Sequence, residues 1–331
     1  MDKLIERLLN SFGVSGRESS IKNIIKSEIE AIKISKKLNM EVKEDAVGNI
    51  IIRLGNGREK FMICTHVDNG GILATMIENN GFIRAYPIGN IKPEKLVRTL
   101  VKFENGVLGR IDSAKDKPSK DDLFIDLGVT SKEVATNQIK EGDVAEVVGY
   151  IMNSNGRVMA PNLHSRLACY IVLEVIKKIN DFDNLDKEMY FVFSTQMETG
   201  FKGAIAAAYE IKPNAAIVLD ALESEDFIGG KGAIKLDKGP IVSIFDKSLV
   251  IHHEVREIIE NAAQRANVNI QYSIGTEKNE GGVIHKEVGG IKTGMIGVPC
   301  RYMYTQEEMI SLKDVNSTID LIYSIVNSRE I

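Results

Sequence analysis

The chain has 331 residues, of which 44% are hydrophobic and 27% charged, and its formal net charge is −4. This length suits one large domain or two medium ones, and the composition is that of a globular protein. The slightly acidic balance leaves no basic surface for nucleic acid. No apolar run approaches the roughly 18 residues that a membrane-spanning helix needs.

Three cysteines, Cys64, Cys169 and Cys300, lie far apart and form no Cys-x-x-Cys pair. Two of them sit in apolar runs, which favours buried thiols in a reducing compartment. The N-terminal segment has the pattern of an amphipathic helix with acidic residues inside it, which a secretory signal lacks. We therefore expect a soluble cytoplasmic protein with no membrane partner and no nucleic-acid partner.

The first half of the chain changes character near residue 71. Residues 1–34 are predicted to form helices, because apolar residues recur there at helical spacing around a Gly-rich turn. Two strands are predicted next, at residues 48–52 and 61–65. From residue 71 to residue 153 short β-type runs alternate with turns, and only residues 131–140 favour a helix. This stretch is predicted to be a small β-barrel or sandwich.

Beyond residue 160 helices and strands alternate again. The pattern predicts helices at residues 167–179, 203–211 and 254–266. It predicts strands at residues 189–194 and 215–219. Continuous apolar strands between amphipathic helices indicate a mostly parallel sheet that is covered on both faces. The predicted fold is therefore a doubly wound α/β domain of residues 1–70 and 154–331, interrupted by an inserted β-barrel-like domain of residues 71–153.

Polar side chains follow several of these strands, at the edge where open α/β sheets bind ligands. His66 and Asp68 follow one strand, Glu198 follows another, and Asp220 follows a third. His164 lies in a segment that is predicted to be the loop before the next helix. A histidine and carboxylates at successive strand ends are typical of a hydrolytic metal site, in which Asp68 would orient the imidazole of His66.

Other interpretations stay open for these residues. A single His-x-Asp after a strand is more often structural than metal-binding. Glu198 and Asp220 could also pair as the two carboxylates of a glycosidase, although nothing in the sequence selects that use. The sequence has no phosphate-binding loop, no dinucleotide-binding glycine motif and no Gly-x-Ser-x-Gly elbow, so His164 and Ser165 are a weak serine-hydrolase candidate.

At these clusters the chain resembles the glutamyl/deblocking aminopeptidases, a metallopeptidase family that includes the tetrahedral aminopeptidases and some proteins once labelled endoglucanases. The resemblance extends over nearly the whole chain and rests on several segments: residues 13–18 (Gly-Val-Ser-Gly-Arg-Glu), 45–49, 65–68, 126–132, 275–285 and 299–303. It implies removal of N-terminal residues from short peptides. It also implies that the inserted domain mediates dimerisation.

The resemblance further implies two divalent metal ions that share a bridging Asp. By position it assigns His66 and Asp220 to one ion and Glu198 to the other, with Asp68 behind His66. Glu280 keeps a carboxylate where the family has an Asp.

Three residues that the resemblance leads us to expect are replaced. His164 stands at the position of the bridging Asp, Met197 at that of the general-base Glu, and Tyr304 at that of a His ligand. An imidazole offers one lone pair to one metal, whereas a carboxylate can span two. Methionine cannot take a proton from water, and a phenol is a weaker ligand than imidazole near neutral pH.

These replacements leave two hypotheses about function. The first is a metal-dependent aminopeptidase whose activity is weak, altered or absent, with at most one divalent ion per chain (zinc, cobalt or manganese) at His66, Asp220 and His164, or with none. The second is a non-catalytic pseudoenzyme that serves as an oligomer subunit or binds peptides in the old cleft. In either case we expect a homo-oligomer.

Overall fold

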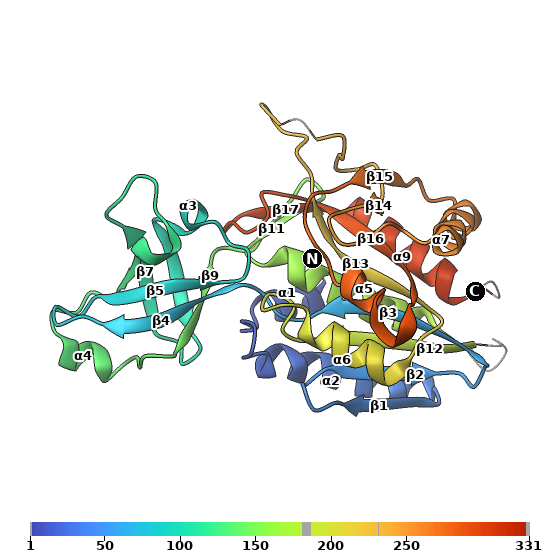
Figure 1. The fold of residues 1–331 in the computed structure, drawn as a ribbon, viewed down its shortest axis with the longest axis horizontal. Helices are drawn as coiled ribbons and strands as arrows, with labels where there is room; N and C mark the ends of the chain where they lie inside the picture. Colours follow the sequence, from blue (N-terminus) through green and yellow to red (C-terminus); the bar gives the residue numbers. More distant parts are fainter. Residues whose placement is uncertain (1, 181–186, 231, 329–331) are drawn as a thin grey trace.

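The middle of the large sheet consists of four neighbouring parallel strands whose residues are nearly all buried. They lie in the order β12 (Lys187–Ser194), β3 (Glu59–His66), β13 (Ala215–Glu223) and β16 (Lys292–Arg301). All eight residues of β12 are buried. Such strands read as continuous apolar runs because both of their faces are covered. The computed structural model describes residues 2–180, 187–230 and 232–328 (Figure 1).

Antiparallel strands flank this centre, so the eleven-stranded sheet is mixed. On one side lie β2 (Ile50–Leu54) and β1 (Met40–Glu44). On the other side lie β17 (Glu308–Ser311), β11 (Arg157–Ala160) and β10 (Met152–Ser154), and β16 also pairs with β14 (Ile241–Phe245), which is followed by β15 (Gln271–Ile274). The centre of the sheet is therefore parallel, as the apolar runs predict. The strands next to it pair antiparallel, and β15 pairs with β14 in parallel.

Helices cover both faces of this sheet, because alternate residues of the central strands point to opposite sides. Phe61 and Ile63 of β3 belong to the larger core, whereas Met62 and Cys64 belong to a smaller core on the other face. The larger core is built with five helices: α1 (Lys3–Leu9), α2 (Ser19–Lys36), α5 (Leu163–Lys178), α7 (His253–Ala266) and α9 (Leu312–Val326). The smaller core is built with α6 (Lys202–Ile211) and α8 (Gly281–Ile284). A short 3-10 helix spans Glu287–Gly289.

The inserted segment forms a closed barrel with its own apolar core, and the barrel stands beside the α/β body (Figure 1). Its strand order is β4 (Gly71–Ile77), β5 (Ile83–Ile88), β8 (Leu123–Asp126), β7 (Leu108–Ser113), β6 (Thr99–Phe103) and β9 (Val144–Val148). It also carries α3 (Pro93–Leu96), α4 (Lys132–Thr136) and a 3-10 turn at Lys120–Asp122. All six barrel strands lie within residues 71–153, and β10 at the end of that segment pairs in the large sheet.

One predicted boundary is wrong in a way that matters for the site. Residues 163–166 were expected to be a loop, but α5 already begins at Leu163. The residue before the helix, Asn162, has a left-handed backbone (φ 59°) and makes no side-chain capping hydrogen bond. The cap comes instead from Glu308, whose Oε2 accepts a hydrogen bond from the backbone N–H of His164 at 2.8 Å. No local sequence signal marks a cap that lies 144 residues away.

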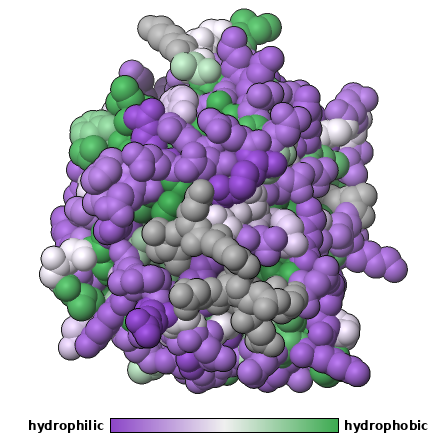
Figure 2. All heavy atoms as spheres, turned by 90° about the vertical axis from the view of Figure 1, so that its right-hand side faces the viewer, coloured by the Kyte–Doolittle hydropathy of each residue, from purple (hydrophilic) through white to green (hydrophobic). Residues whose placement is uncertain are grey.

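In the described part of the chain, no helix combines the length and the apolar character needed to cross a bilayer. The end of the α/β body that faces away from the barrel is mostly hydrophilic on its surface (Figure 2).

Candidate active site

The strand end of β3 places His66 against β13. His66 is fully buried, and its Nε2 lies 3.2 Å from Oδ1 of Asp220. Its Nδ1 donates to the backbone carbonyl of Asp68 at 2.8 Å, while the carboxylate of Asp68, which was expected to orient the ring, is 3.8 Å away. Burial alone would lower the pKa of His66, but Asp220 and Asp68 outweigh it and raise the pKa well above its usual value. Asp220 is therefore a buried partner that favours the protonated form of His66.

The carboxylate of Asp68 is bound to the loop that follows β12. Its Oδ1 accepts from the backbone N–H of Met197 at 2.9 Å, and its Oδ2 accepts from that of Glu198 at 3.0 Å. Burial would raise the pKa of Asp68, but the imidazole of His66 and these two N–H groups outweigh it and lower the pKa. Asp68 thus connects the end of β3 to the backbone of the Met197–Glu198 segment.

His164 lies in the first turn of α5 and is held by Glu308. Its Nδ1 is 2.7 Å from Oε1 of Glu308, so the Nδ1 proton points at that carboxylate. Its Nε2 is buried without a hydrogen-bond partner and lies 3.8 Å from Oε1 of Glu198, which also lacks one. Burial alone would lower the pKa of His164, but the two carboxylates outweigh it and raise the pKa to about 9.

Tyr304 covers His164 from the segment after β16. The centres of the two rings are 4.6 Å apart, and the backbone of Tyr304 is left-handed (φ 62°). Its backbone N–H donates to Oε1 of Glu308 at 2.6 Å, so one buried carboxylate binds both residues. Burial raises the pKa of the Tyr304 phenol well above its usual value. At neutral pH the phenol is therefore uncharged.

Glu280 is a further buried carboxylate of the site region, at the start of α8. Its Oε1 accepts a hydrogen bond from the hydroxyl of Ser194 at 2.7 Å, and its Oε2 is buried without a partner. Burial raises the pKa of Glu280 to about 7. Met197 itself is only partly buried, and its side chain brings no titratable group to the site.

Sequence reasoning missed Glu308, which organises His164 and Tyr304. It also missed the barrel turn that closes over Glu198, where the backbone N–H of Asn90 donates to Oε2 of Glu198 at 3.2 Å. Neither residue stands in a motif or at a predicted strand end, so no signal in the chain marks them.

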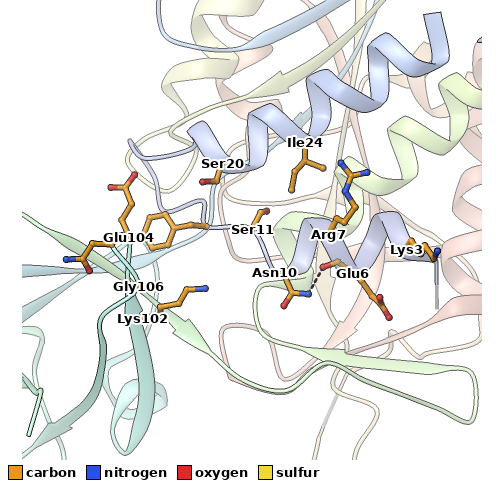
Figure 3. A pocket seen from close by; sticks show the side chains of 12 residues that line it. Lys3, Glu6, Arg7, Asn10, Ser11, Ser20, Ile24, Lys102, Glu104 and Gly106 are labelled. Carbon is orange, nitrogen blue, oxygen red and sulfur yellow. Dashed lines mark hydrogen bonds between the residues drawn. The ribbon is translucent and has the colours of Figure 1, made fainter. Parts of the chain in front are cut away.

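A cleft of about 870 Å³ lies elsewhere, where the first two helices face the barrel (Figure 3). It is lined by twelve residues: Lys3, Glu6, Arg7, Asn10, Ser11, Phe12, Ser20, Ile24, Lys102, Glu104, Asn105 and Gly106. Its walls mix both charges, and none of the predicted site residues lines it. The convergence of buried titratable groups, rather than the volume of this cleft, identifies the candidate site.

The family model for the M42 glutamyl aminopeptidases matches residues 48–321. This chain belongs to that family. A relative from Acetivibrio thermocellus is 33% identical over 336 residues, which cover 98% of each chain. The TET aminopeptidase of a marine sediment archaeon of the Thaumarchaeota has 26% identity and a TM-score of 0.92, covering 99% of this chain and 96% of its own. The TET1 peptidase of Pyrococcus horikoshii has 27% identity and a TM-score of 0.87, covering 98% and 99%, and can assemble into a tetrahedron or a large octahedral shell.

Membership in the M42 family confirms the expected fold, a mixed α/β body with a separate closed barrel. The family is metal-dependent in general, which raises the question of whether these residues fit two metal ions. Among the residues described, no three His, Cys, Asp or Glu side chains converge on a point that could hold a metal ion. Nδ1 of His164 is taken by Glu308, and its Nε2 faces Glu198. His164 can therefore offer a single nitrogen to a metal ion.

Proposed function

We propose that this M42-family protein has lost most or all of the two-metal peptide hydrolysis of the family. The observation that carries the proposal is His164 at the bridging position, with its Nδ1 held by Glu308 at 2.7 Å. Only Nε2 is left to bind anything, and a single nitrogen cannot replace the two oxygens of a carboxylate. We infer at most one divalent ion per chain (zinc, cobalt or manganese), at His66 and Asp220 with His164 as a further ligand.

The replacement of the general base also supports a loss of peptide hydrolysis. Met197 occupies the general-base position, and a thioether cannot accept a proton from water. Loss of a general base alone typically costs about 10²–10⁴-fold in rate. Residual hydrolysis would act on N-terminal residues of short peptides, since that is the substrate class of the family.

Metal content and turnover of the purified protein test this proposal. We expect no more than one equivalent of divalent metal after dialysis, and little or no release of amino-acid anilides with Zn²⁺, Co²⁺ or Mn²⁺. Met197→Glu alone should restore little, because the bridging carboxylate is still missing. The combination of Met197→Glu, His164→Asp and Tyr304→His should bind two ions and recover part of the activity.

The opposite result would be two tightly bound ions and robust turnover by the unmodified chain, lost with chelator and with Glu198→Ala. That result would mean that His164 and Tyr304 serve as ligands in a different two-metal arrangement.

A second candidate function is non-catalytic: an oligomer subunit that binds short peptides in the old cleft. The complete barrel supports this candidate, because it is closed and has an apolar core of its own besides its contact with Tyr304. The assembly of the Pyrococcus horikoshii TET1 peptidase supports it further. A peptide that binds with unchanged affinity after metal removal would favour this function over weak hydrolysis.

A further inference from the structure

The Gly-Val-Ser-Gly-Arg-Glu segment at residues 13–18 has no part in the function proposed above. In the fold it lies against the loop after β12. Glu18 is buried, and its Oε1 accepts hydrogen bonds from the backbone N–H of Gly16 at 2.7 Å and from that of Gln196 at 3.2 Å. The hydroxyls of Ser15 and Thr199 lie within hydrogen-bond distance of each other, at 3.2 Å.

Together Glu18 and Asp68 bind three successive backbone N–H groups of this loop. Glu18 takes that of Gln196, and Asp68 takes those of Met197 and Glu198. Gln196 also has a left-handed backbone (φ 56°), which is unfavourable for a residue other than glycine. A loop in this conformation needs partners to hold it, and charged acceptors make stronger hydrogen bonds to N–H groups than neutral ones do.

A purely structural role explains Glu18 poorly. Glu18 precedes the first residue of α2, yet its side chain makes no capping hydrogen bond to that helix. Burial raises the pKa of Glu18, and the nearby carboxylate of Asp68 adds to the rise, so keeping Glu18 charged here is unfavourable. The side chain instead accepts hydrogen bonds from the backbone N–H of Gly16 in its own turn and from that of Gln196 in the loop after β12.

We infer that Glu18 is a positioning residue, which acts with Asp68 to hold the segment from Gln196 to Glu198 in the conformation that aims Glu198 at His164. The assignment of this loop to the functional site rests on the proposed function, but the contacts of Glu18 do not. Removing Glu18 should therefore disturb the loop whether or not the protein hydrolyses peptides.

Met197 provides a probe of this loop in the unmodified site. With methyl-labelled methionine, the Met197 resonance can be assigned by Met197→Leu among the 11 methionines. We expect Glu18→Ala to shift or split this resonance by more than its line width, and Glu18→Gln, which keeps one acceptor oxygen, to have a smaller effect. Glu30→Gln, at an exposed position of the same α2 helix, is the matched control and should leave the resonance unchanged.

A second measurement uses the variant with Met197→Glu, His164→Asp and Tyr304→His. In that background Glu18→Gln should lower kcat by about 10-fold with KM and metal content unchanged, since small displacements of reacting groups are costly. If that variant is inactive, the proposed function fails and the methyl spectra alone decide the role of Glu18.

Two results would overturn the inference. One is a Met197 resonance in Glu18→Ala that matches the Glu30→Gln control. The other is a general change at all methionines together with a large drop in melting temperature, which would make Glu18 an ordinary residue of the fold.

Discussion

The charge on His164 depends on two buried acids. Glu308 lies 2.7 Å from its Nδ1, and Glu198 lies 3.8 Å from its Nε2. Because these carboxylates raise the pKa to about 9, the protonated ring stabilises the folded state. This contribution is fully present below the unfolded pKa of about 6.5 and is lost as the pH rises through about 9. The contribution of His164 to stability is therefore pH-dependent.

The variant Glu308→Gln tests this electrostatic coupling. We expect it to lower the pKa of His164, because a neutral amide no longer stabilises the imidazolium. The pKa can be followed through the ring protons of His164 by NMR titration. Glu307→Gln is the matched control, since that neighbouring side chain is exposed. Equal pKa values of His164 in the two variants would mean that Glu308 has only a structural role.

At the scale of elements, the turn between β5 and α3 closes over the site. Gly89 has a left-handed backbone (φ 90°), and a Cβ built on it would lie 2.3 Å from Oε2 of Glu198. The next residue, Asn90, donates its N–H to that same oxygen and its side-chain amide to Glu277 at 3.3 Å. The barrel therefore contributes backbone to the wall of the site, and only glycine leaves room for the Glu198 carboxylate.

Gly89→Ala should be destabilising for two reasons, and Gly106→Ala separates them. Gly106 has nearly the same backbone angle (φ 91°), but nothing lies within 4 Å of its built Cβ. Both variants lose the freedom of glycine, and only Gly89→Ala also crowds Glu198. We expect Gly89→Ala to reduce the free energy of unfolding by about 1–3 kcal/mol more than Gly106→Ala, as overpacking does. Urea unfolding measures both, and equal losses would show that the turn adapts.

At the scale of the whole molecule, the barrel and the α/β body are in direct contact near the site. Lys95 donates to the carbonyl of Met303 at 2.5 Å, and Gln306 donates to the carbonyl of Val148 at 2.9 Å. Tyr304 packs against the cores of both domains. The barrel therefore contacts the segment that carries Tyr304 directly.

Assembly is the property to test at this scale. We expect a homo-oligomer, at least a dimer, with contacts made by the barrel. Leu100 of β6 and Leu108 of β7 are 55% and 60% exposed, and the strand register places both on one face of the barrel. Changing both to Glu should lower the mass measured by light scattering at micromolar concentration. Ile34→Glu, on α2 and 69% exposed, is the control that should leave it unchanged. A wild-type monomer would contradict the expectation.

Burial patterns that repeat along the chain could be predicted from the sequence. The continuous apolar runs of β3, β12 and β13 identified the central strands, and the alternation from residue 71 onward identified the barrel. His66 and Asp220 could be expected to meet because parallel strands end at one edge of a sheet. These features depend on local periodicity, which predicts each strand, and on the alternation of strands with helices, which predicts that the strands are parallel.

Contacts between distant segments were decided only by the tertiary structure. Glu308 caps α5 and holds His164 from 144 residues away, which is why the helix begins at Leu163 without a local signal. Glu18 binds the loop at Gln196 across 178 residues. The sequence by itself determined the family and the layers of the fold. Which carboxylate each buried N–H group or imidazole binds depends on how the segments pack, because a carboxylate serves equally well from any part of the chain that packing brings within reach.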